Sequence, residues 1–143
     1  MSRKVERIRE VARVFKPRGW KLVEKPSDGK TDGCADMSTR TITCPPLVTE
    51  YALFVYLHEV GHVRCGHLLA GQPGVGWLEE YEAEMWAMAA MRAVGFRITR
   101  EMMNNARENV RHHLLWADMG GAHVEYDRKI VMFAFPDTWR DFI

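Results

Sequence analysis

Residues 50–63 read EYALFVYLHEVGHV, and this stretch determines how the rest of the chain is interpreted. Its length and apolar content predict a buried helix, with Thr49 placed to cap the N-terminus. Within it, His58, Glu59 and His62 form the pattern HExxH. Side chains four residues apart lie about 40° apart around a helix, so both imidazoles project from one face. We therefore expect the two histidines to bind one metal ion, with Glu59 beside it.

The surroundings of the HExxH pattern strengthen this interpretation. A shuffled chain of the same histidine and glutamate content would contain the pattern roughly 2% of the time, so the pattern alone is only suggestive. Polar side chains without a partner rarely occupy an apolar helix, however. The competing interpretation is that His58 and His62 are structural histidines whose hydrogen bonds are satisfied within the protein.

A catalytic zinc site usually has three protein ligands, so a third must come from elsewhere in the chain. Cys65 returns to the same helix face but lies ~10 Å further along the axis than His58. His67 misses the ten-residue spacing of the pattern HExxHxxGxxH. The other candidates lie on a second strong helix predicted over residues 77–94. There Glu82 falls on an otherwise apolar stripe and needs a partner, so it is the expected third ligand, with Glu79 as its closest rival.

Charge is distributed unevenly along the chain. Residues 50–90 carry six acidic and one basic side chain, a local charge of −5, whereas residues 1–30 carry ten basic and four acidic ones, a local +6. In the acidic stretch, Glu80 and Glu84 are expected to pair with each other on a different helix face, nearer the solvent. Like Glu79, they are interpreted as surface acids. The basic N-terminal part is interpreted as a solvated helix face rather than a nucleic-acid-binding arm.

The remaining sequence predicts a single α+β domain over residues 1–143. Further helices are expected over 2–15 and 99–117, and a hairpin over 123–135. Strands are expected over 20–23 and 34–44.

Composition narrows the class of protein. Of 143 residues, 47% are hydrophobic and 27% charged, which is globular rather than disordered composition. The chain has twenty basic and nineteen acidic side chains, and this near-zero net charge argues against a protein whose main role is to bind along a polyanion such as a nucleic acid. The longest apolar run, Tyr51 to Leu57, is far too short for a membrane span, and the N-terminus lacks a secretory pattern. Three cysteines, Cys34, Cys44 and Cys65, are too few for a disulfide scaffold, so we expect a cytoplasmic protein.

The stretch HEVGHVRCGH, followed at residues 82–87 by EAEMWA, resembles the ImmA/IrrE family of zincin metallopeptidases. The family pattern is HE-x-GH, often with a further histidine, and then E-A-x-x-(aromatic)-A on the following helix. The resemblance covers residues 38–94. It implies a minimal zincin-like fold, in which a small sheet packs on the HExxH helix and a glutamate-bearing helix follows. It also implies Zn²⁺ on His58, His62 and Glu82, with Glu59 as the catalytic base.

The expected activity is zinc-dependent hydrolysis of a peptide bond in a protein substrate. Family members typically cleave a helix-turn-helix repressor, so the resemblance implies such a partner. Neither a membrane nor directly bound nucleic acid is expected as a partner. The alternative is a non-catalytic, zinc-binding regulatory module that interacts with proteins, and the intact Glu59 weighs against it.

Two parts of the predicted site stay open at the level of sequence. Several side chains are possible transition-state donors, and none is favoured: His112, His113, His123 and Tyr126. A strand over residues 38–44 has two equally supported interpretations. It binds an extended substrate by adding a strand to the sheet, or it is an ordinary packed strand.

Overall fold

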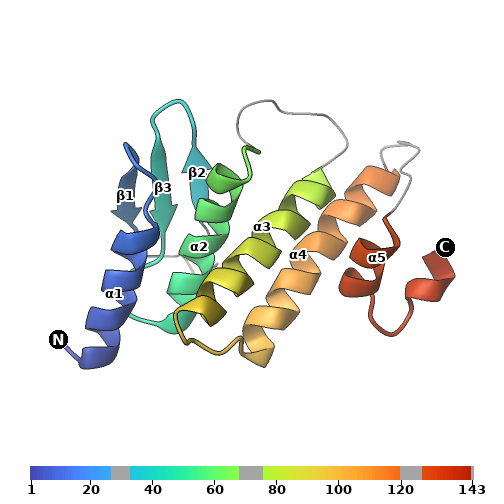
Figure 1. Ribbon diagram of the computed structural model, residues 1–143. Coiled ribbons are helices and arrows are strands. Elements are labelled where there is room, and N and C mark those ends of the chain that lie inside the picture. Colours follow the sequence, from blue (N-terminus) through green and yellow to red (C-terminus); the bar gives the residue numbers. More distant parts are fainter. Residues whose placement is uncertain (27–32, 68–75, 120–126, 143) are drawn as a thin grey trace.

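The helix that carries His58 and His62, α2 (Glu50–Arg64), lies between a small sheet and two further helices (Figure 1). This computed structural model describes residues 1–143 except 27–32, 68–75, 120–126 and 143. The described residues form an α+β fold, which confirms the predicted class. In chain order its other elements are α1 (Arg3–Phe15), β1 (Lys21–Glu24), β2 (Cys34–Asp36), β3 (Thr41–Cys44), α3 (Gly76–Ala93), α4 (Arg100–Met119), α5 (Arg128–Ala134) and a short 3-10 helix, η1 (Trp139–Phe142).

Helix α2 begins and ends where the local sequence requires. The Thr49 hydroxyl accepts a hydrogen bond from the backbone N–H of Ala52 at 3.0 Å, which confirms the predicted cap. At the other end Gly66 has a φ of +74°, the left-handed conformation that favours glycine. Between these ends the helix is buried on several sides, so apolar residues surround it rather than forming one stripe. No helix in the described ranges has the length and apolar character to cross a membrane.

The sheet has three strands in the order β1-β3-β2 and packs on α2 through β3 and β2. β1 is parallel and β2 antiparallel to β3, and Ile42 and Cys44 of β3 are fully buried. The prediction of one strand over 34–44 is wrong, because the chain turns between β2 and β3. Asp36 Oδ1 accepts hydrogen bonds from the backbone and hydroxyl of Ser38, and Arg40 adopts a φ of +50°. Since β3 is paired on both sides, residues 41–44 form an ordinary packed strand and offer no free edge.

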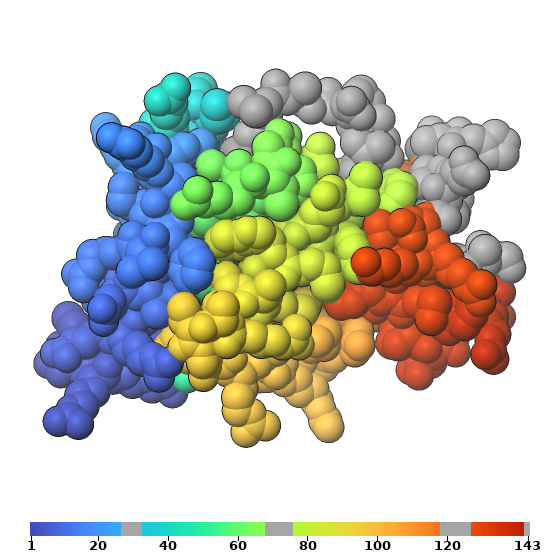
Figure 2. All heavy atoms as spheres, viewed as in Figure 1, coloured from blue at the N-terminus to red at the C-terminus, as the bar shows by residue number. Residues whose placement is uncertain are grey.

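Helices α2, α3 and α4 lie side by side, with α1 against the other flank of α2 (Figure 1). The Tyr56 hydroxyl joins α2 to α1 by donating a hydrogen bond to the Ala12 carbonyl at 3.0 Å. In the space-filling view of Figure 2, α3 fills the surface between α1 and α5. The helices therefore enclose α2 and hold its polar side chains inside the molecule.

The C-terminal part differs from the prediction. A hairpin was expected over 123–135, but residues 128–134 form α5, and 123–126 lie outside the described residues. Asp127 caps this helix by accepting a hydrogen bond from the backbone N–H of Lys129 at 2.9 Å. Ile130, Val131 and Ala134 are buried, which is helical rather than alternating spacing. The local cap and packing therefore outweigh the β-propensity of this apolar segment.

Candidate metal centre

Three ligand atoms converge between α2 and α3. His58 Nε2 and His62 Nε2 lie 3.0 Å apart, and Glu80 Oε2 lies 3.0 Å from the first and 2.8 Å from the second. Tetrahedral coordination with bonds of about 2.0–2.1 Å places ligand atoms roughly 3.3 Å apart, close to these separations. Two imidazoles and one carboxylate are also a donor set that divalent transition metals accept. His58, His62 and Glu80 could therefore hold one metal ion.

A glycine on α2 allows the close approach that brings Glu80 to the histidines. A Cβ atom added to Gly61 would lie 2.9 Å from the Ala83 carbonyl oxygen and 3.1 Å from the Ala83 Cα. Any larger residue would therefore push the backbone of α3 away. Because Gly61 has no side chain, α2 and α3 can lie in contact. Glu80, one turn before Ala83 on α3, then reaches His62.

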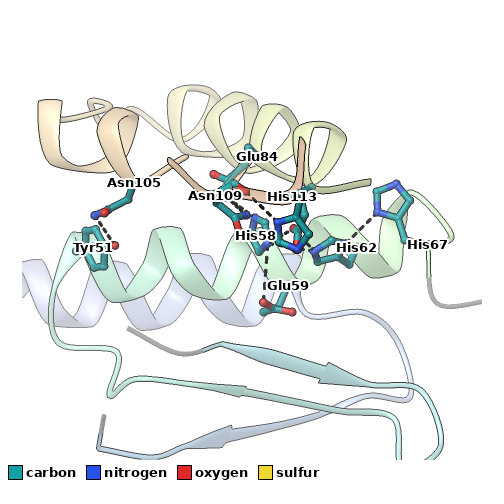
Figure 3. A network of polar contacts seen from close by, with 10 residues as sticks. Tyr51, His58, Glu59, His62, His67, Glu84, Asn105, Asn109 and His113 are labelled. Atoms are coloured by element: carbon teal, nitrogen blue, oxygen red, sulfur yellow. Dashed lines mark hydrogen bonds and ion pairs between the residues drawn. The ribbon is translucent and has the colours of Figure 1, made fainter. Parts of the chain in front are cut away.

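The second nitrogen of each imidazole also has a partner (Figure 3). His58 Nδ1 lies 2.7 Å from Glu84 Oε1, and Glu84 is only 5% exposed. The Asn109 side chain of α4 donates a hydrogen bond to the same Glu84 oxygen at 3.3 Å. His62 Nδ1 lies 2.9 Å from His67 Nδ1. Such outer contacts orient metal-binding histidines and set which nitrogen carries the proton.

Contacts between the imidazoles and the glutamates shift the pKa values of His58 and Glu80 in opposite directions. Burial disfavours the charged form of His58, but contacts with Glu80 and Glu84 outweigh burial and raise its pKa well above the usual value. For Glu80, burial raises the pKa, but hydrogen bonds with His58 and His62 outweigh it and hold the pKa well below its usual range. Glu80 is thus an ionised carboxylate beside two basic nitrogens, as a metal ligand must be.

Glu59 lies beside the group without joining it. Its carboxylate points toward the sheet (Figure 3), with Oε1 4.0 Å from His58 Nε2. Burial raises its pKa, and attraction to His58 and His62 offsets this only in part. Gly33 presses against it, because an added Cβ there would lie 2.9 Å from Glu59 Cγ. A buried carboxylate with a raised pKa is suited to accept and release a proton near neutral pH.

An open cleft of about 500 Å³ leads to these side chains. Gly33 and Val55 line it, and Asn109 and His112 of α4 line it as well. His58, Glu59, Glu80 and Glu84 are among the residues that line it. At one end the Asn105 side chain donates a hydrogen bond to the Tyr51 hydroxyl at 2.7 Å and so links α4 to α2 (Figure 3). The cleft is large enough for a few residues of an extended chain.

The structure does not bring Glu82 to the histidine pair. The Glu82 side chain is 47% exposed, and its ionic contact is with His67 Nε2 at 3.4 Å. Two residues along a helix correspond to about 200° of rotation, so Glu82 and Glu80 lie on nearly opposite faces of α3. The expected third ligand, Glu82, therefore lies outside the group that could hold a metal ion, and Glu80 takes its place in that group. The interpretation of Glu80 and Glu84 as surface acids is wrong, because both contact His58.

Of the possible transition-state donors in the described residues, His113 has an ionic contact with the group. Its Nδ1 lies 2.9 Å from the Asn109 carbonyl oxygen, and its Nε2 lies 3.7 Å from Glu80 Oε1. His112 is exposed at the cleft. His123 and Tyr126 lie outside the described residues.

No protein-family model, curated protein or solved structure matches this chain. What the site can do is therefore inferred from its own geometry and chemistry.

Proposed function

We propose that the protein is a zinc-dependent peptidase in which His58, His62 and Glu80 bind the metal and Glu59 is the catalytic base. One observation carries the proposal: three ligand atoms lie within 3.0 Å of one another, and a buried carboxylate stands beside them unligated. A structural site has no use for that carboxylate, so its position favours catalysis over the alternative of a regulatory module. The resemblance to the ImmA/IrrE family supports the same proposal.

Zinc is the proposed ion because two imidazoles and one carboxylate are a common ligand set of catalytic zinc sites. An ion held there supplies Lewis acidity, which polarises a carbonyl group and makes water a better nucleophile near neutral pH. His58 and His62 bind through Nε2, the atoms that face Glu80. Glu84 keeps the proton of His58 on Nδ1 and so leaves Nε2 free to bind.

Glu59 moves the proton that the hydrolysis requires. It accepts a proton from the attacking water as the water oxygen bonds to the scissile carbonyl carbon. It then gives that proton to the amide nitrogen as the carbon–nitrogen bond breaks, so the products are a carboxyl group and an amine. Its raised pKa favours both halves of this transfer, because a carboxylate of ordinary acidity would be a weaker base.

The proposed substrate is an extended segment of a protein. The cleft runs along α2 between Gly33 and α4, and Gly33 directly precedes β2, an edge strand. A peptide lying there passes Glu59, His58 and Glu80. A helix-turn-helix repressor, the typical substrate in the family that the sequence resembles, is the proposed partner.

Glu59→Gln tests the catalytic role separately from metal binding. Gln has nearly the same shape but cannot accept the proton, so hydrolysis of a protein substrate should fall by about 10²–10⁴-fold with the zinc content unchanged. Glu79→Gln, on α3 but outside the group, is the matched control and should cleave like the wild type. Wild-type cleavage rates in Glu59→Gln would contradict the proposal.

A further inference from the structure

We propose that His67 and Glu82 form a relay that positions His62 for metal binding. This inference rests on the proposed function in one respect, that His62 Nε2 faces the metal. The relay runs from His62 Nδ1 to His67 Nδ1 at 2.9 Å, and from His67 Nε2 to Glu82 Oε1 at 3.4 Å. It gives a role to the carboxylate that the sequence pattern singles out and that does not reach the histidine pair.

The direction of the hydrogen bonds follows from the metal-facing nitrogen. A neutral His62 that binds through Nε2 carries its proton on Nδ1, so it donates to His67 Nδ1. His67 must then accept at Nδ1 and carry its own proton on Nε2, the nitrogen that faces Glu82. Every nitrogen in the relay therefore has one role, and the negative charge of Glu82 strengthens the chain from its far end.

The end of α2 is built to place His67 beside His62. The backbone N–H of Gly66 donates to the Val63 carbonyl at 3.2 Å, and that of His67 donates to the His62 carbonyl at 3.0 Å. This pair of bonds, with Gly66 at positive φ, is the Schellman motif. The motif usually brings two apolar side chains together, but here it brings two imidazoles, whose ring centres lie 5.2 Å apart.

The His67 side chain is buried, so its contacts with His62 and Glu82 are shielded from water. The His67 side chain is only 7% exposed although it lies beyond the last turn of the helix. A buried imidazole needs partners for both nitrogens. Among the described residues, His67 Nδ1 has His62 within hydrogen-bond distance, and His67 Nε2, which is buried and makes no hydrogen bond, has the Glu82 carboxylate as an ionic contact at 3.4 Å. His58, one turn deeper in α2, is instead held directly by Glu84. His58 is thus oriented by direct contact with a carboxylate, whereas His62 is oriented through a second imidazole, that of His67.

Zinc affinity of the full chain, measured by competition with a chelator, tests the relay. His67→Phe keeps a ring in the same place but removes both nitrogens, so it should weaken zinc binding by about 10–100-fold. His67→Gln can still accept from His62 and donate to Glu82, and it should recover part of the loss. Glu82→Gln should weaken binding by severalfold in the wild type and have no effect on top of His67→Phe. Glu79→Gln is the matched control and should bind like the wild type.

Imidazole nitrogen NMR of the zinc-loaded wild type gives a second readout, one that a merely structural role would not produce. We expect the proton of His62 on Nδ1 and that of His67 on Nε2. Wild-type affinity in folded His67→Phe, or a proton on His67 Nδ1, would overturn the relay and leave the proposed function standing. A wild-type chain that binds no zinc would overturn both.

Discussion

Two glutamates next to the same histidines, the buried Glu59 and the half-buried Glu80, have opposite electrostatic roles. Glu80 lies 2.8–3.0 Å from both imidazoles, and these contacts outweigh its burial and lower its pKa. Glu59 lies 4.0 Å from His58 and touches neither ring as closely, so burial dominates and raises its pKa. Close contact with both imidazoles therefore keeps the pKa of Glu80 low, whereas burial with weaker attraction keeps the pKa of Glu59 high.

At this scale the third ligand can be tested directly. Glu80→Gln removes the charged oxygen that faces both histidines and should weaken zinc binding by more than about 100-fold, beyond the usual effect of an outer-shell change. Glu82→Gln should cost only severalfold, because that carboxylate acts through His67. Chelator competition on the two purified variants compares them. A larger loss in Glu82→Gln than in Glu80→Gln would contradict the assignment.

The pairing of α2 with α3 is the decisive feature at the scale of elements. His58 and His62 are four residues apart on one helix, and Glu80 and Glu84 are four apart on the next. Because the chain reverses between the two helices (Figure 1), His62 meets Glu80 and His58 meets Glu84. Contact at Gly61 sets how closely the helices approach and which face of α3 is turned to α2.

Gly61→Ala tests the importance of this approach. Alanine favours a helix by about 1 kcal/mol over glycine, yet here its Cβ would collide with the backbone of Ala83. We expect α3 to shift and zinc affinity to fall by about 10–100-fold, while the circular dichroism of the helices stays unchanged. The control is Gly76→Ala, where the added Cβ meets only His113 at an ordinary 3.5 Å. Equal zinc affinity in the two variants would show that helix separation does not control the site.

Helices α2, α3 and α5 show which structural features could be predicted from the sequence and which could not. The HExxH helix and its Thr49 cap follow from local pattern, and both are confirmed. Local pattern also placed α3, but the choice between Glu80 and Glu82 depends on the rotation of α3, which a contact with α2 sets. The matching four-residue spacing of the histidine and glutamate pairs was the available signal. Residues 128–134 were assigned to a hairpin because apolar alternation there resembles a strand, whereas the Asp127 cap favours a helix.

At the scale of the whole molecule, the site joins elements that are far apart in the sequence. The side chains that could hold a metal come from α2 and α3, Asn109 of α4 contacts Glu84, and Gly33 next to β2 contacts Glu59. A metal ion held by this group would bind the folded arrangement and not the unfolded chain, so its binding should stabilise the entire fold.

This stabilisation should depend on pH in a defined direction. The folded-state pKa of His58 is raised, so its protonated form stabilises the metal-free protein below about pH 6.5, and that contribution is lost as pH rises through the raised pKa. Zinc must displace the same proton, so binding strengthens over the same range. Thermal unfolding with and without zinc should give a larger rise in Tm at pH 8 than at pH 6. A zinc-induced rise that is equal at both pH values, or larger at pH 6, would contradict this linkage.

Diffraction from zinc-loaded crystals of the wild type, with anomalous data collected on both sides of the zinc absorption edge, tests the central claim most directly. We predict one anomalous peak between α2 and α3, about 2.0–2.2 Å from His58 Nε2, His62 Nε2 and a carboxylate oxygen of Glu80. No peak there at saturating zinc, or a peak whose ligands exclude Glu80, would contradict it.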